Sequence, residues 1–254
     1  MNLKISKRLI CAAEMAGTAK ILADIGTDHA YLPIHMLLHK RIENAIVTDI
    51  NSGPLKRAKK NAVLYGVSDK IKPILTDGLN GVERFSPDVI VIAGMGGELI
   101  ARIISEADFL KDEKSRLVLQ PMTKPEILRK ELIKNGFSIS EEKLVSDGKL
   151  YVLISAQFNG QPDPYTEAEL LVGKKEHFSC DLLFEEHVSG ILKRTVSSLN
   201  GISCSSQAEK HTDTIKKQEE IICELYRMLS DSKAYDRFTE EIKKHKDDNA
   251  FRTL

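Results

Sequence analysis

The sequence predicts an α/β domain followed by a helical domain, and three observations indicate this. From about residue 20 to residue 158, short apolar runs alternate with amphipathic stretches, a pattern typical of βαβ units in a parallel sheet. The last two apolar runs of this region are joined by a tight turn instead of a helix. Beyond residue 158, apolar residues recur at helical spacing and no strand is predicted. We therefore expect a mostly parallel sheet with a terminal antiparallel hairpin, followed by a C-terminal pair of helices.

The elements of the first domain follow in order along the chain. An amphipathic helix is predicted to begin at SKRL (6–9), with Ser6 as its N-cap. The last two strands of the domain, at 137–145 and 150–158, flank Asp147-Gly148, which is a strong hairpin signal. Five apolar runs, each followed by a helical pattern or a helix-starting turn, predict the parallel strands at residues 21–26, 45–50, 71–77, 88–94 and 116–121.

A domain boundary is predicted after Phe158, where NGQPDPY is rich in Gly and Pro. Residues 1–158 are expected to form the sheet domain with its basic N-terminal helix, and residues 159–254 a helical domain and tail. SLNGISCSSQ (198–207) is expected to be the turn of an antiparallel helical hairpin of coiled-coil type, and KKHKDDNAFRTL (243–254) a solvated end. The apolar residues that predict the two helices are Phe184, Val188, Ile191, Leu192, Val196 and Leu199, then Ile215, Ile222, Leu225 and Leu229.

Composition is that of an ordinary soluble protein of 254 residues, 42% apolar and 29% charged. No apolar stretch approaches the ~18 residues of a membrane span, and the N-terminus lacks the features of a signal peptide, so we expect a cytoplasmic protein. The net charge is zero, but it is unevenly distributed. Residues 1–158 contain 23 Lys+Arg and 19 Asp+Glu, and the remainder contains 14 Lys+Arg and 18 Asp+Glu. The four cysteines are scattered, which favours reduced thiols over a disulfide framework or a metal site: Cys11, Cys180, Cys204 and Cys223.

Three successive predicted strands end at or near an aspartate, namely Asp24, Asp49 and Asp77. Ligands of open α/β sheets bind outside the carboxyl ends of the strands, so these ends indicate the site. A dinucleotide loop has the pattern G-x-G-x-x-G, but Asp28 stands at the second glycine position and would repel a pyrophosphate. S-adenosylmethionine carries a sulfonium, an ammonium group and a ribose diol but no phosphate, so an acidic lining suits it.

The positions of these residues suggest individual contacts. Asp49 is placed to accept hydrogen bonds from the ribose hydroxyls, and Asp77 from the adenine amine. Gly94, having no side chain, would let the backbone approach the methionine portion closely.

Four stretches resemble the bacterial tRNA methyltransferases of the TrmK type, which modify N1 of adenine 22. They are SKRL (6–9), DIGTDHAYLP (24–33), AGMGG (93–97) and LQP (119–121). The resemblance covers nearly the whole chain and implies a Rossmann-like class I methyltransferase sheet, S-adenosylmethionine as cofactor and tRNA as substrate. It also implies that the cofactor is bound by Asp24, Gly26 and Asp28 at the methionine end, Asp49 and Asn51 at the ribose, Asp77 and Gly78 at the adenine, and Gly94 and Met95 near the sulfonium.

The catalytic candidates are Asp28, His29 and Tyr31. Ring N1 of adenine has its own lone pair, so no general base has to remove a proton before it attacks the methyl group. The main tasks of the enzyme are then alignment and charge stabilisation. Asp28 could stabilise the positive charge that develops on the base. His29 could accept a proton from the exocyclic amine or simply hydrogen-bond the base, and Tyr31 could stack on a flipped adenine. His29 could equally be a cap or packing residue, Tyr31 a core residue, and Met95 a filler of the core. Pro33 is expected in the first turn of a helix.

The sequence after the fourth strand bears on the acceptor. Methyltransferases of exocyclic amines carry an N/D-P-P-Y/F/W string there, whereas this chain has AGMGG. That difference favours a ring nitrogen.

For tRNA contact we favour Lys4, Lys7 and Arg8, with their basic groups pointing outward, although they could simply form a solvated face. A second basic cluster, formed by Lys56, Arg57, Lys59 and Lys60, ranks lower. The helical hairpin either grips the RNA or only packs, and a monomer is favoured. Two other functions stay open: a small-molecule methyltransferase of the same fold, and a non-catalytic coiled-coil adaptor.

Overall fold

The computed structural model describes residues 3–112, 114–161, 163–178, 182–203 and 211–229. The chain forms two compact units. The first unit runs to Pro164 and also takes in His177 and Phe178, and the second begins at Tyr165. The division therefore lies a few residues beyond the boundary predicted after Phe158.

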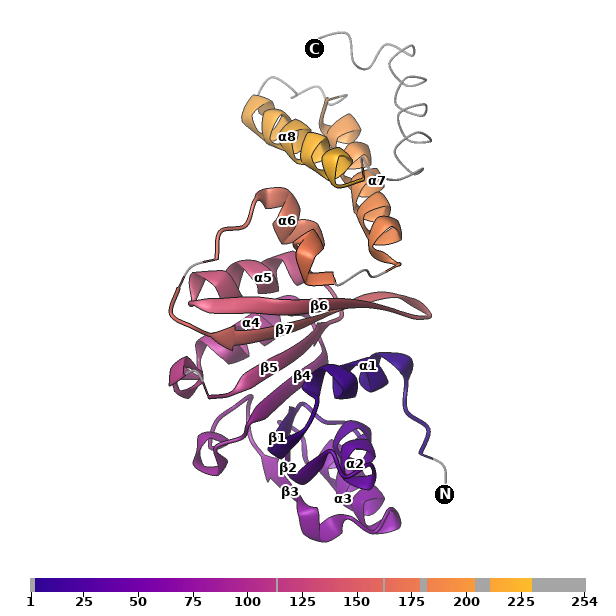
Figure 1. The fold of residues 1–254 in the computed structure, drawn as a ribbon, viewed down its shortest axis with the longest axis vertical. Helices are drawn as coiled ribbons and strands as arrows, with labels where there is room; N and C mark the ends of the chain where they lie inside the picture. The colour runs from indigo at the N-terminus through magenta and orange to yellow at the C-terminus, as the bar shows by residue number, and fades with distance from the viewer. Residues whose placement is uncertain (1–2, 113, 162, 179–181, 204–210, 230–254) are drawn as a thin grey trace. The chain divides into compact units, whose positions relative to one another are not determined.

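The first unit contains a seven-stranded sheet in the order β3-β2-β1-β4-β5-β7-β6 (Figure 1). β1 to β5 are mutually parallel, and β7 is antiparallel to both β5 and β6. The predicted sheet and its terminal hairpin are thus confirmed. The strands are β1 (Ala19–Ile25), β2 (Ile42–Asp49), β3 (Ile71–Leu75), β4 (Val89–Met95), β5 (Arg116–Pro121), β6 (Phe137–Asp147) and β7 (Lys149–Phe158).

Helices cover both faces of the sheet. α1 (Lys7–Ala16), α2 (Tyr31–Leu38) and α3 (Ser52–Leu64) pack beside one another on one face, while α4 (Gly97–Ser105) and α5 (Pro125–Lys134) pack together on the other (Figure 1). Short 3₁₀ turns lie at Ser68–Lys70, Glu83–Phe85, Asp108–Asp112 and Lys175–Phe178. This three-layer arrangement explains why the central strands are continuous apolar runs, because side chains on both faces of the sheet are buried.

The burial of the central strands is nearly complete. Ile90, Val91 and Ile92 of β4 are each 0% exposed. At the other end of the sheet, Gly148 takes a φ of +80° between β6 and β7, which is the left-handed conformation that the Asp-Gly pair predicts. An ion pair is also buried inside this unit: the Arg129 guanidinium of α5 donates to Glu142 of β6, and both side chains are fully buried.

The second unit is helical in its described part. α7 (Phe184–Ser203) and α8 (Thr212–Leu229) lie side by side, joined by a hydrogen bond from Gln218 to Ser198 (Figure 1). Val188, Leu192 and Leu225 are 0% exposed, as the apolar spacing predicts. The pair of helices is confirmed, and its coiled-coil character stays a prediction.

Two details of this unit differ from expectation. α7 continues through residues 198–203, so the predicted turn at 198–207 is wrong for its first part, and the remainder lies outside the described residues. A glycine inside a helix costs only about 1 kcal/mol, and the buried Leu199 extends the packing beyond Val196. A short helix, α6 (Glu167–Val172), was not expected; Thr166 and Glu169 form its capping box. The predicted frayed tail, 243–254, also lies outside the described residues.

Candidate functional site

The carboxyl ends of β1, β2, β3 and β4 meet at one edge of the sheet. β2 and β3 lie on one side of β1, and β4 pairs with β1 on its other side. The strand order therefore reverses beside β1, which is where ligands of such folds bind. Backbone hydrogen bonds tie the ends together: Thr27 donates to the Thr48 carbonyl at 2.8 Å, and Thr76 to the Asp49 carbonyl at 3.1 Å. The three predicted aspartates therefore lie at or just beyond the ends of adjacent strands.

A cavity of about 470 Å³ opens at this edge. It is formed by the start of the chain, the loop from β1 to α2, and the end of β4. Eight of the predicted site residues line it: Lys4, Arg8, Asp24, Gly26, Asp28, His29, Tyr31 and Gly94. Ser6, Leu9, Thr27, Ala30, Leu32 and Ala93 complete the lining.

Asp24 supplies a buried carboxyl to this cavity. Burial raises its pKa to about 6, and a hydrogen bond with Thr27 opposes the rise only in part. No ion pair joins Asp24 to a Lys, Arg or His of the described chain. A desolvated carboxyl without a cationic partner is a group that a cationic ligand would stabilise.

Asp28, His29 and Tyr31 form a connected group in the lining of the cavity. His29 Nε2 lies 3.1 Å from Asp28 Oδ2, and the His29 and Tyr31 rings are stacked, with their centroids 5.0 Å apart and their planes within 6°. The other Asp28 oxygen, Oδ1, accepts from Nε of Arg57 at 3.1 Å and from Nη2 of the same residue. The three catalytic candidates are thus brought together, and Arg57 is joined to them.

Arg8 does not point outward, which corrects the prediction for this residue. Its Nη1 donates to Oε1 of the buried Gln120 at 2.7 Å. A Cβ on residue 94 would lie only 3.6 Å from the same Nη1, so the guanidinium lies directly over Gly94. Lys4 and Lys7 are exposed, as expected.

Ser6 is the N-cap of α1 by position, but its hydroxyl makes no capping hydrogen bond. Ser6 Oγ is instead buried beside the cavity without a hydrogen-bond partner among the described residues. Such an atom is expected to bind a ligand or water. The sequence pattern did not indicate a binding role for Ser6, because a serine at the start of a helix is already explained as an N-cap.

The remaining cofactor candidates lie nearby but do not line the same cavity. Asp49 Oδ1 accepts from the Asn51 backbone N–H at 2.7 Å, which orients the carboxylate. Asp77, next to Gly78, lies 3.4 Å from Arg102 Nη2 and lines a separate cavity of about 260 Å³.

Met95 occupies the position that a side chain at residue 26 would need. A Cβ on Gly26 would collide with Met95 Cε, and Gly26 has a φ of +72°. This contact places Met95 against the loop after β1, where it can act as a wall of the site as well as a packing residue.

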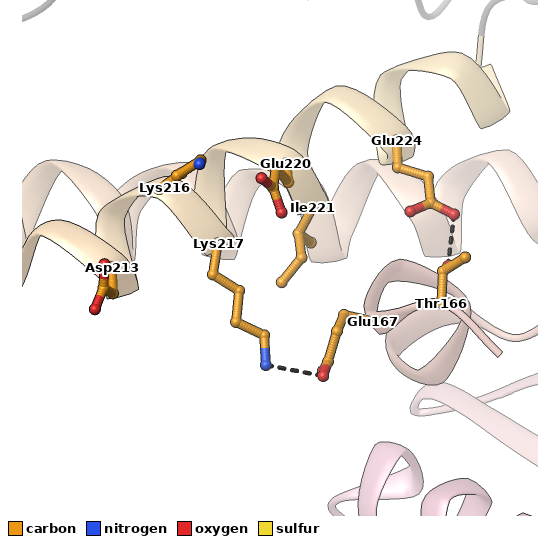
Figure 2. A pocket seen from close by; sticks show the side chains of 8 residues that line it. All are labelled: Thr166, Glu167, Asp213, Lys216, Lys217, Glu220, Ile221 and Glu224. Atoms are coloured by element: carbon orange, nitrogen blue, oxygen red, sulfur yellow. Dashed lines mark hydrogen bonds and ion pairs between the residues drawn. The ribbon is translucent and has the colours of Figure 1, made fainter.

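A pocket of about 470 Å³ in the second unit has a different character. It lies between the start of α6 and the side of α8, as Figure 2 shows, and carries four carboxylates against two lysines. Lys217 pairs with Glu167 at 2.8 Å, and Thr166 donates to Glu224 at 2.5 Å. This face would repel phosphates, so we do not assign it to RNA binding.

Two features are absent from the described residues, a membrane-spanning helix and a metal-binding cluster. None of the described helices is long and apolar enough to cross a membrane. Within the same part of the chain, His, Cys, Asp and Glu form no group of three or more that could hold a metal ion. Cys11 and Cys223 are thiols, and Cys180 and Cys204 lie outside the described residues.

The chain is similar to proteins of known activity over most of its length. Residues 5–154 match the family described as a methyltransferase domain. The tRNA (adenine(22)-N(1))-methyltransferase of Bacillus subtilis (strain 168) is 32% identical over 221 residues, which is 85% of this chain and 93% of that protein.

Two solved structures extend this comparison. The crystal structure of the B. subtilis M1A22 tRNA methyltransferase TrmK is 31% identical with a TM-score of 0.74, over 87% of this chain and 100% of that one. M. capricolum TrmK in complex with its natural cofactor product S-adenosyl-homocysteine is 28% identical with a TM-score of 0.72, over 86% and 97%. The chain therefore belongs to the methyltransferase-domain family and, within it, to the TrmK-type tRNA (adenine(22)-N(1))-methyltransferases.

Proposed function

We propose that this protein transfers a methyl group from S-adenosylmethionine to N1 of adenine 22 in tRNA. The observation that carries the proposal is the cavity at the reversal of strand order, with the buried carboxyl of Asp24 inside it. The similarity to TrmK proteins along most of the chain supports the same function. We further infer a cytoplasmic enzyme, since its substrate would be tRNA.

The residues at the site fit the cofactor by charge and by hydrogen-bonding capacity. S-adenosylmethionine supplies an electrophilic methyl group when bound, and its methionine end is cationic at the sulfonium and the amine. Asp24 offers a carboxyl that gains by meeting a cation, and the unpartnered Ser6 hydroxyl offers a polar contact. One oxygen of Asp49 is fixed by the Asn51 backbone, which leaves the other for the ribose diol. We assign the adenine end to Asp77 and Gly78.

The catalytic task of the chain is to align the base and to accommodate its charge. We assign Asp28, His29 and Tyr31 to the side of the target adenine. Because Asp28 is shared between Arg57 and His29, its charge is less available to the base than that of a free carboxylate. The Tyr31 ring, which lies parallel to His29, supplies a flat surface of the kind on which an extruded base rests.

The test of the function is incubation of the protein with unmodified tRNA and labelled S-adenosylmethionine, followed by nucleoside analysis. We expect N1-methyladenosine, and none in a tRNA with guanine at position 22. Label in another nucleoside would contradict the proposed acceptor. Cofactor binding without RNA methylation would favour a small-molecule methyltransferase, and no cofactor binding at millimolar concentration would favour a non-catalytic protein.

Replacement of Asp49 by alanine tests the cofactor placement. We expect S-adenosylmethionine binding to weaken by about 10- to 150-fold, because a hydrogen bond to a charged acceptor contributes about 1.5–3 kcal/mol. Calorimetry measures this directly. Asp69→Ala, an exposed aspartate at the turn before β3, is the matched control. Equal affinities of wild type and Asp49→Ala would show that the ribose lies elsewhere.

A further inference from the structure

The loop that carries the catalytic candidates is held by two side chains of α3. Arg57 donates to Oδ1 of Asp28 through Nε, at 3.1 Å, and through Nη2. One turn further along the helix, the Asn61 side-chain amide donates to the His29 carbonyl at 3.0 Å. α3 therefore fixes both the side chain of one loop residue and the backbone of the next.

The Arg57 contact reaches the aromatic pair through Asp28. With Oδ1 occupied by Arg57, the second oxygen, Oδ2, faces His29 Nε2 at 3.1 Å. An anionic carboxylate only accepts hydrogen bonds, so this contact favours the imidazole tautomer that carries its proton on Nε2. Nδ1 is then the acceptor of the ring. The same contact holds the imidazole parallel to Tyr31.

The basic residues of α3 are not equivalent. Lys60 is exposed and makes no hydrogen bond or ion pair within the described part of the chain, as expected of a solvated face. Arg57 belongs to the same sequence cluster but is directed at the loop. The side chains of Arg57 and Asp28 are 48% and 63% exposed, and exposed pairs contribute little to folding stability. The contact is thus better explained by where it places Asp28 than by stability.

We propose that Arg57 is a positioning residue for methyl transfer. It fixes Asp28, Asp28 sets the tautomer and orientation of His29, and His29 Nδ1 accepts a hydrogen bond from the exocyclic amine of the target adenine, next to the reacting N1. This inference rests on the proposed function. It also gives the exposed Asp28 a role as an intermediary between Arg57 and the imidazole.

Kinetics separate positioning from a simple contact with tRNA phosphates. In Arg57→Gln we expect kcat to fall about 10- to 100-fold, because small displacements of an aligning group cost that much, with unchanged S-adenosylmethionine affinity. Arg57→Lys keeps the charge but loses the planar fork and recovers only part of kcat. Added guanidinium should restore activity to Arg57→Ala. In the control, Lys60→Gln, any loss is confined to KM for tRNA.

A second measurement needs no substrate. Long-range ¹H–¹⁵N NMR spectra distinguish the two neutral imidazole tautomers, and His29→Gln assigns the signal. We expect the Nε2–H tautomer in wild type and in Lys60→Gln, and a mixture in Arg57→Gln. An unchanged tautomer in Arg57→Gln would overturn the proposal, as would an Arg57→Gln effect limited to KM and equal to that of Lys60→Gln. A wild-type protein inactive on tRNA would instead contradict the proposed function, while the tautomer experiment would still decide the role of Arg57.

Discussion

At the scale of single residues, Asp24 combines a folding cost with the binding function that we propose for it. Burial raises its pKa to about 6 from 3.8, so the folded chain holds the proton more tightly than the unfolded chain does. Between these two values, stability falls as pH rises, and above pH 6 the full penalty is present. Two pKa units correspond to about 3 kcal/mol.

Asp24→Asn should remove this penalty, because the amide is uncharged at every pH. In the absence of cofactor, we expect the free energy of unfolding to exceed that of wild type by up to about 3 kcal/mol at pH 7. The difference should shrink as pH falls through 6 toward 4. Denaturant titrations at pH 4.5, 6 and 7.5 measure it. A difference that does not vary with pH would exclude a buried carboxylate as the cause.

Asp24→Asn should raise stability but lower cofactor affinity. A cation bound beside Asp24 favours the carboxylate, so S-adenosylmethionine should bind wild type more tightly as pH rises through 6. Asp24→Asn should bind weakly and lose this dependence. A gain in apo stability together with a loss in binding would identify Asp24 as a residue retained for function at a cost to folding.

At the scale of secondary structure elements, the end of α2 contains a local strain that a single substitution can relieve. Lys40 has a φ of +54°. Its N–H donates to the Leu37 carbonyl, and the N–H of Arg41 to that of Met36, which is the Schellman pattern that normally places glycine in the left-handed position. α3 ends in the same pattern with Gly66 at the equivalent site.

We therefore expect Lys40→Gly to raise the free energy of unfolding by about 1 kcal/mol, since a left-handed backbone costs a non-glycine residue about that much. The reciprocal variant, Gly66→Lys, should lose a similar amount. A steric clash would not explain the loss in Gly66→Lys, because a Cβ on residue 66 would meet nothing within 4 Å. Thermal or urea unfolding checks both. Changes of the same sign in the two variants would refute the backbone explanation.

The elements themselves were largely predictable, and most errors lie at their ends. All seven strands were expected, because apolar runs and the Asp-Gly turn are local signals. β1 and β2 begin earlier than predicted, because Ala19 pairs with Ile42 through backbone bonds that need no apolar side chains. The start of the turn between α7 and α8 was wrong, because packing of the buried Leu199 outweighs the weak helix propensity of Gly201.

The candidate site was predictable by position but not by side-chain direction. The strand ends located Asp24, Asp49 and Asp77, because topology alone brings these ends to one edge. The inward direction of Arg8 depends on its contact with Gln120, which lies 112 residues away in the sequence. Arg57 likewise looked like its solvated neighbours, since its contact with Asp28 joins different elements. Long-range side-chain contacts of this kind have no local sequence signal.

At the scale of the whole molecule, the proposed cofactor residues belong to the first unit alone, from Asp24 to Met95. This unit has its own buried core, and Phe178, 3% exposed, belongs to it. A truncation should therefore end after residue 178, so that Phe178 is retained. The helices beyond that point are not needed to form the cavity, and we infer that they serve the tRNA substrate.

Truncation after Phe178 should consequently leave S-adenosylmethionine affinity within about twofold of wild type, while tRNA methylation falls by at least about tenfold. The acidic face of α6 and α8 is unsuited to phosphates, so contact would fall to exposed basic residues of α7, Lys193 and Arg194. In the full chain, replacing both by glutamine should raise KM for tRNA and lower the salt dependence of binding, since each neutralised phosphate adds to the salt slope. Lys216→Gln on the acidic face is the control. Full tRNA activity in the truncated protein would show that the helical unit only packs and does not bind tRNA. Substrate binding would then be assigned to Lys4, Lys7 and the sheet unit.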